Sequence, residues 1–83
     1  MVDITNIEEQ VFYILSVTLN IPVSEINSNS SMKTIREWDS LGHLNIVEAM
    51  EQYLEIELTL DELSTISSVQ DWVEIFIKYQ QIK

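Results

Sequence analysis

The chain has 83 residues, of which 46% are apolar, so we expect one small domain with a packed core and no room for a two-lobed catalytic cleft. It lacks cysteine and has a single histidine, which excludes a disulfide scaffold, a thiolate nucleophile and a cysteine zinc site, and leaves too few ligands for a transition-metal site. Its formal net charge is −10, from 14 acidic and 4 basic residues, so nucleic acid and membrane surfaces are not expected partners.

The N-terminal part of the chain predicts a first helix that ends before Pro22. Thr5 and Glu8 have the spacing of a capping box, in which a hydroxyl and a carboxylate satisfy N–H groups at a helix start. Pro22 stops the helix, because proline has no N–H to donate and restricts the residue before it. Between these signals, apolar residues recur at helical spacing: Ile7, Val11, Ile14, Leu15 and Leu19.

A long irregular segment, residues 20–38, follows this helix. Residues 27–31 are all polar and indicate a loop, and a loop of this length in a small domain is usually functional or disordered. Apolar residues along it are expected to hold it against the helices: Ile21, Val23, Ile26, Met32, Ile35 and Trp38. We therefore expect an ordered, functional loop.

A second helix is expected to begin at residue 39 or 40 and to end near residue 54. One side of its helical wheel is apolar: Ile46, Val47, Met50, Tyr53 and Leu54, with Leu44 at the margin. Glu48, Glu51 and Glu55 occupy positions i, i+3 and i+7 and form a separate exposed stripe. Like charges in such a row repel one another, so we expect them to serve something other than helix stability.

Two further capping boxes predict two helices near the C-terminus. Thr59 and Glu62 start a short helix that ends near Ile66, and Ser67 and Gln70 start the last one. The last helix has an apolar face that is expected to point inward: Val69, Trp72, Val73 and Phe76. Residues 1–83 are thus expected to form one all-α domain, a four-helix bundle with a long first loop and a short third helix.

The acidic residues are distributed unevenly. Between Glu37 and Ile77 there are ten acids and no lysine or arginine. A solubilising surface explains such residues in many small proteins, but so one-sided a stretch favours a face that docks onto basic patches of partner proteins.

Nothing in the sequence predicts export or membrane insertion. No apolar run approaches the ~20 residues that a membrane span needs. The first nine residues carry acids and lack the basic start and long apolar stretch of a secretion signal. We therefore expect a cytoplasmic protein.

The most informative segment is Trp38-Asp39-Ser40-Leu41-Gly42-His43-Leu44. It places Ser40 in the first turn of the second helix, where backbone N–H groups and the helix dipole stabilise anions such as a phosphodiester. Simple capping explains the same pattern, because serine and aspartate are the commonest N-cap residues. Spacing alone favours simple capping over an attachment site.

Asp39-Ser40-Leu41 followed by a helix resembles the Asp-Ser-Leu signature of acyl carrier proteins, in which the serine carries 4′-phosphopantetheine. The resemblance continues at residues 8–11, 19–21, 47, 49–51, 57–58, 66 and 68–70, and so covers essentially the whole chain. It implies that Ser40 is the attachment site, and that Asp39 and Leu41 belong to the motif that a phosphopantetheinyl transferase reads. It also implies the acyl-carrier type of four-helix bundle.

Family members have no catalytic activity and usually act as monomers. The resemblance implies that this chain holds an acyl group as a thioester on 4′-phosphopantetheine, as in fatty acid or polyketide biosynthesis, and that it needs no metal. Its partners would be the transferase and the acyl-loading and acyl-transferring enzymes, which present basic docking patches. The second helix is the docking helix of the family, so Leu41, Glu48, Glu51 and Glu55 are the expected docking residues.

Three departures from the fatty-acid type lie on this helix. Gly42 stands where the family often has an acid, Asn45 replaces an acid used for docking, and Glu48 stands where an exposed apolar residue is usual. A dedicated carrier of a specialised pathway is therefore favoured, with carbohydrate-modifying, polyketide-like and amino-acid-activating pathways all compatible. The Gly-Gly-x-Ser start of many peptidyl carriers is absent, which argues against a nonribosomal peptide module.

Two rival interpretations of this segment compete with the carrier. In a hydrolase, Ser40 would be the nucleophile and His43 the base, but the Gly-x-Ser-x-Gly elbow is missing. His43 also lies three residues further along the same helix, and it cannot readily act on Ser40 while Asp39 orients it from the other side. The alternative is a cofactor-free acidic helical protein–protein interaction module, in which Ser40 is only a cap. Modification of Ser40 by a transferase separates this alternative from the carrier.

Overall fold

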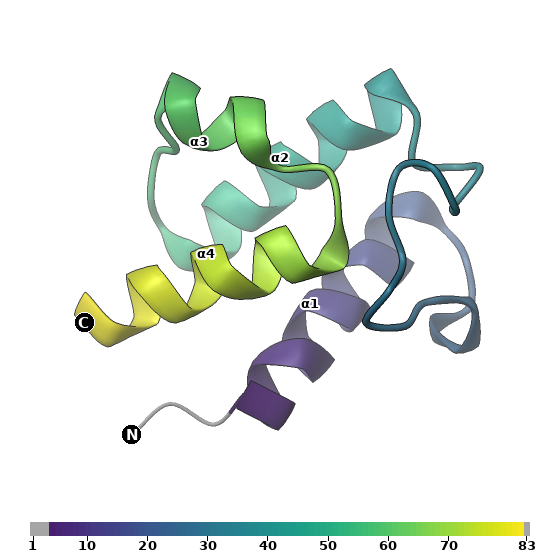
Figure 1. The fold of residues 1–83 in the computed structure, drawn as a ribbon, viewed down its shortest axis with the longest axis horizontal. Coiled ribbons are helices and arrows are strands. Elements are labelled where there is room, and N and C mark those ends of the chain that lie inside the picture. The colour runs from purple at the N-terminus through teal and green to yellow at the C-terminus, as the bar shows by residue number, and fades with distance from the viewer. Residues whose placement is uncertain (1–3, 83) are drawn as a thin grey trace.

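The fold is described from a computed structural model, in which residues 4–82 and the side chains of residues 6–80 are defined. Within that part the chain forms four α-helices and a 3-10 turn: α1 (Ile4–Leu19), η1 (Val23–Glu25), α2 (Ser40–Leu54), α3 (Leu60–Thr65) and α4 (Val69–Ile82). Figure 1 shows the three longer helices around a common centre, with the loop between α1 and α2 gathered at one end of the bundle. The predicted all-α architecture is thereby confirmed.

The core is built from one face of each longer helix. The residues with the least exposed surface repeat at spacings of three or four, as the sequence predicted: Ile7, Val11 and Leu15 in α1, Ile46, Met50 and Leu54 in α2, and Val69, Trp72 and Phe76 in α4. Burying each such side chain stabilises the fold by roughly 1.5–3 kcal/mol. The prediction for Tyr53 is wrong, because its ring is 51% exposed and lies over Phe76 at the edge of the core.

The loop between α1 and α2 is ordered by two kinds of contact. Four of its predicted apolar anchors are buried: Ile21, Ile26, Ile35 and Trp38. Val23 is not an anchor, because it lies in η1 and is 54% exposed. The loop backbone is also joined to the start of α4, since Met32 N–H donates to the Ser67 carbonyl and Val69 N–H donates to the Ser30 carbonyl, each at 3.0 Å. The loop therefore brings Ser40 to a fixed place.

The capping predictions have different outcomes. The Thr59–Glu62 box at α3 is confirmed, with both reciprocal hydrogen bonds present. At α4 the prediction is shifted by one residue: Ser68 Oγ, not Ser67, accepts an N–H, from Asp71. The Asp71 carboxylate accepts from Ser67 N–H. At the other end of the chain, α1 begins at Ile4, and the side chain of Thr5, the predicted cap, lies outside the described residues.

Glu62 joins α3 to α4. Its carboxylate accepts hydrogen bonds from Lys78 Nζ at 2.7 Å, from Thr59 N–H at 2.9 Å and from the Tyr79 hydroxyl at 2.8 Å. The Lys78 ammonium, followed by the Thr59 N–H, lowers the pKa of Glu62 from 4.5 to about 2. Because the folded-state pKa lies below the unfolded one, these contacts stabilise the fold above pH 4.5 and lose that effect as the pH falls towards 2.

We expect Glu62→Gln to lower the free energy of unfolding by about 1 kcal/mol at neutral pH, because the cap and the contacts to α4 weaken together. The wild type should also lose stability more steeply than Glu62→Gln between pH 4.5 and about 2. Urea unfolding over a pH series measures both effects, with the exposed neighbour Asp61→Asn as the matched control. Equal slopes for the wild type and Glu62→Gln would contradict this account.

Candidate functional site

Asp39 determines where α2 begins. Its backbone is extended, and its carboxylate accepts a hydrogen bond from Gly42 N–H at 2.8 Å. Its carbonyl accepts from His43 N–H at 2.7 Å. Ser40 is consequently the first residue of α2, with its side chain exposed to solvent. The start of a helix leaves backbone N–H groups without intrahelical partners, so this hydroxyl stands beside groups that stabilise an anion.

Gly42 allows the start of α2 to pack closely against the preceding loop and the end of α1. A Cβ atom at Gly42 would stand 2.4 Å from the Glu37 carbonyl oxygen and 3.1 Å from Leu19 Cδ2. Any larger residue would thus push α2 away from the loop and from the end of α1. The sequence showed Gly42 only as a departure from an expected acid, and the structure gives the physical reason for glycine there.

Trp38 and His43 join the loop to α2 across the Asp39 cap. The Trp38 indole is 1% exposed, and its Nε1–H donates to Nδ1 of His43 at 3.0 Å. The two rings are nearly parallel, at 18°, with centroids 6.3 Å apart. Burial lowers the pKa of His43 below its usual value of 6.5, which favours the neutral form of the ring. Sequence reasoning identified both residues but not the bond between them, which depends on how the loop folds back.

This arrangement argues against a hydrolytic triad. The base of such a triad is oriented by a carboxylate, whereas Nδ1 of His43 is bound to Trp38 and the Asp39 carboxylate is bound to Gly42 N–H. Asp39 therefore caps the helix, and His43 is a half-buried residue beside Ser40.

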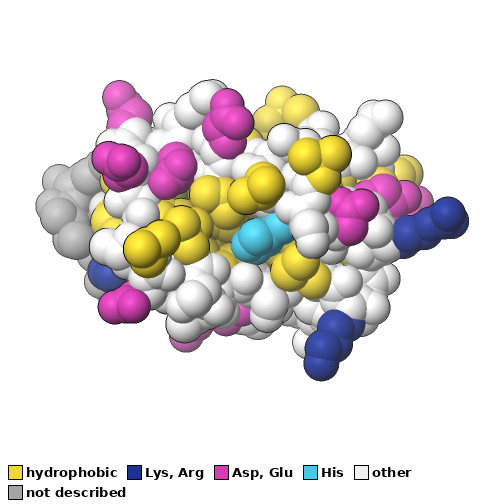
Figure 2. Space-filling view, turned by 90° about the horizontal axis from the view of Figure 1, so that it is seen from above, with side chains coloured by type: hydrophobic (Ala, Val, Ile, Leu, Met, Phe, Trp, Pro, Cys, Tyr) yellow, Lys and Arg dark blue, Asp and Glu magenta, His cyan; other side chains and the backbone are white. Residues whose placement is uncertain are grey.

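Of the predicted docking residues, Leu41, Glu48 and Glu51 lie on α2, whereas Glu55 is the C-cap that follows it, with a φ of 56° in the left-handed region. The predicted stripe of three acids along one helix is thus wrong at Glu55. Leu41 is 68% exposed, and Glu48 and Glu55 are exposed as well. Glu51 is half-buried, and its carboxylate accepts from Leu58 N–H at 2.9 Å, so it also closes the link between α2 and α3. Figure 2 shows acidic side chains beside an apolar band in which the single histidine lies.

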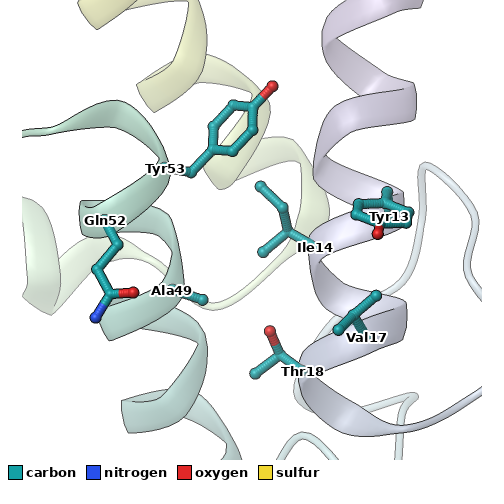
Figure 3. Close-up of a pocket in the computed structure, with 7 residues that line it drawn as sticks. All are labelled: Tyr13, Ile14, Val17, Thr18, Ala49, Gln52 and Tyr53. Atoms are coloured by element: carbon teal, nitrogen blue, oxygen red, sulfur yellow. The ribbon is translucent and has the colours of Figure 1, made fainter.

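A second surface feature is an open groove of about 360 Å³ between α1 and α2. Figure 3 shows it between Tyr13 and Val17 of α1 and Ala49, Gln52 and Tyr53 of α2. At 100° per residue, Ala49 lies on the opposite side of α2 from Ser40. The groove is therefore separate from the surface on which Ser40 stands.

Two classes of site have no counterpart in the described part of the chain. No group of His, Asp or Glu residues within residues 4–82 is arranged to hold a metal ion. Over the same residues, no helix has both the length and the apolar character of a membrane span.

Comparison with known proteins decides the family. The family model described as "Phosphopantetheine attachment site" matches residues 9–76, which include Ser40 and the whole of α2. The chain belongs to the acyl carrier protein family. The acyl carrier protein of Buchnera aphidicola subsp. Schizaphis graminum (strain Sg) is 29% identical to it over 69 residues, which cover 83% of this chain and 87% of that protein. The resemblance found in the sequence is thereby confirmed.

Membership settles the general role of the chain. Acyl carrier proteins are carriers rather than enzymes, their prosthetic group is covalently attached 4′-phosphopantetheine, and they interact with enzymes of biosynthesis. The start of α2 fits such a group, because it combines an exposed serine hydroxyl with the anion-stabilising first turn of a helix.

Proposed function

We propose that Ser40 is the residue that carries 4′-phosphopantetheine, and that residues 1–83 form a single carrier domain. The observation that supports this most is the exposed Ser40 side chain at the first position of α2, directly after the Asp39 cap. When attached, the group supplies a thiol that holds an acyl chain as a thioester. The protein supplies a fixed helix start on which the group is mounted and a surface that partner enzymes recognise.

The attachment proposal is tested by loading. Purified apo protein is incubated with coenzyme A and a broad-specificity phosphopantetheinyl transferase, and its intact mass is measured. We expect a gain of one phosphopantetheinyl group in the wild type and none in Ser40→Ala. Ser24→Ala, which alters an exposed serine in η1, is the matched control and should load normally. A folded wild-type protein that stays unmodified would instead favour the cofactor-free interaction module.

The acidic surface of α2 and its C-cap is the proposed docking face, with Leu41 and Glu48 of α2 and the C-cap Glu55 as its exposed residues. Partners would bring basic patches, because complementary charge accelerates encounter and selects partners. Glu51 is proposed for docking as well, but its bond to Leu58 N–H means that its replacement also disturbs the link to α3. Glu48 and Glu55 are therefore the cleaner positions for testing this face.

We expect Glu48→Lys to lower kcat/KM for transferase loading about 3- to 10-fold, because one favourable charge contact at the rim of the interface becomes repulsive. The decrease should shrink as salt is raised. Glu74→Lys, an exposed charge reversal on α4, is the control and should have little effect. Equal rates for both variants would remove α2 from the docking face.

The pathway is proposed to be a specialised one rather than general fatty acid synthesis. Gly42 is needed for the close approach of α2 to Glu37, Asn45 offers no charge, and Glu48 adds a charge at an exposed position. This α2 surface differs in charge from the fatty-acid type, so a dedicated set of partner enzymes would select it. We place this work in the cytoplasm, with the carrier acting as a monomer.

A further inference from the structure

The two ring nitrogens of His43 have different roles in the fold. Nδ1 accepts a hydrogen bond from the buried Trp38 Nε1–H at 3.0 Å. A ring nitrogen that accepts a hydrogen bond carries no proton, so the neutral imidazole must carry its proton on Nε2. Trp38 therefore fixes the tautomer of His43 and makes Nε2–H a hydrogen-bond donor.

This donor belongs to the same helical turn as Ser40. His43 follows Ser40 by three residues, a spacing that puts two side chains on the same face of a helix, and helical side chains lean towards the helix N-terminus. The ring is only half-buried, and Figure 2 shows it reaching the surface within the apolar band. Within the described residues, His43 has the Trp38 bond and no acceptor for its Nε2–H.

The charged groups near the ring leave this donor available. Burial is what lowers the His43 pKa, and among the described residues the ring has no ion pair. The acid nearest to His43 along the sequence, Asp39, accepts a hydrogen bond from Gly42 N–H with its carboxylate. His43 Nε2–H is thus a hydrogen-bond donor without an acceptor, close in sequence to a helix start that stabilises anions. The oxygen atoms of a phosphate ester are suitable acceptors for such a donor.

We propose that His43 Nε2–H donates a hydrogen bond to the phosphodiester carried on Ser40, and that Trp38 is the positioning residue that fixes this donor. The inference rests on Ser40 being the attachment site. In the loaded protein the Trp38 N–H and the phosphodiester would occupy the two nitrogens of one neutral imidazole. The base of the arm would thus be held against α2, while the arm beyond the phosphodiester stays mobile.

A purely structural role for the pair makes a different prediction. If His43 only ties the loop to α2, then its Nε2–H gains no hydrogen-bond acceptor on loading, and the Nε2 nitrogen shift of the neutral ring stays as in the apo protein. If it also contacts the phosphodiester, then the added negative charge must stabilise the imidazolium form and raise the His43 pKa in the loaded protein.

The single histidine makes this measurable by nuclear magnetic resonance. Imidazole nitrogen shifts of ¹⁵N-labelled protein are followed against pH in the apo form and in the loaded form, whose loading is verified by intact mass. We expect the Nε2–H tautomer in the apo protein and a titration midpoint at higher pH after loading. The ³¹P signal of the phosphodiester should change at that same midpoint, and His43→Gln should abolish this change. Trp38→Phe, which keeps an aromatic ring but lacks the indole N–H, should lose the tautomer preference.

The possible failures are distinguishable. If the protein loads but the His43 midpoint and the ³¹P signal do not respond, the contact is overturned and the carrier function stands. If no group is added to the wild type, both the attachment site and the contact are overturned. The comparison of apo and loaded wild type does not depend on any variant folding.

Discussion

Replacing Gly42 with alanine is expected to destabilise the protein, although alanine is normally the better helix residue. Glycine inside a helix is usually worse than alanine by roughly 0.5–1 kcal/mol. Here the added Cβ would lie 2.4 Å from the Glu37 carbonyl oxygen, a backbone atom that moves only with the loop. Overpacking of this kind costs about 1–3 kcal/mol, so the clash outweighs the gain in helix propensity.

We therefore expect Gly42→Ala to lower Tm by roughly 4–8 °C for each kcal/mol lost in a domain of this size. Loading of Ser40 should also slow, because the displaced loop carries Asp39 with it. Asn45→Ala, an exposed change in the same helix, is the control and should leave Tm nearly unchanged. An increase in Tm for Gly42→Ala would show that the loop yields freely and that glycine is not required there.

Trp38→Ala should lower the free energy of unfolding strongly. It removes a side chain that is 1% exposed, and losses of buried tryptophan cost roughly 3–5 kcal/mol. Small domains are stable by only about 5–15 kcal/mol, so the variant should lose a large part of its stability, which urea unfolding measures. Trp38→Phe keeps most of the packing but removes the donor to His43, and should cost closer to 1–2 kcal/mol.

The Trp38–His43 bond also predicts how stability depends on pH. Burial keeps the His43 pKa below its usual 6.5, so the unfolded chain takes up a proton more readily than the folded one. Stability is then fully present above pH 6.5 and declines as the pH falls through the folded-state pKa. Urea unfolding at pH 7.5 and at pH 5, for the wild type and His43→Gln, measures this contribution. A larger decline in His43→Gln than in the wild type would contradict the assignment.

Local signals in the sequence predicted the elements that depend on neighbouring residues. The start of α2 at residue 39 or 40 and the Thr59–Glu62 box at α3 are both confirmed, because caps act over three or four residues. The inward faces of the longer helices are confirmed too, with Tyr53 as an exception. Tyr53 lies on the apolar side of the helical wheel, but in the folded protein this position contacts only the edge of the core, at Phe76.

The features that escaped prediction depend on contacts between distant segments. Ser68 caps α4 in place of Ser67. At this point the loop between α1 and α2 pairs with the segment before α4, and Gln70 Nε2 donates a hydrogen bond to the Ser28 carbonyl. The second role of Glu51, as acceptor for Leu58 N–H, depends on how the α2–α3 link folds back. Helical periodicity does not predict which distant residues become hydrogen-bond partners. The bond between Trp38 and His43 could not be predicted for the same reason, because it depends on how the loop folds back onto α2.

The central claim is that Ser40 carries the prosthetic group, and fragmentation mass spectrometry of the loaded protein tests it most directly. Wild-type protein is treated with coenzyme A and a phosphopantetheinyl transferase, and the modified residue is located along the chain. The account predicts one phosphopantetheinyl group per chain, on the fragment that contains Ser40. A group on another serine, or a folded chain that several transferases leave unmodified, would contradict it.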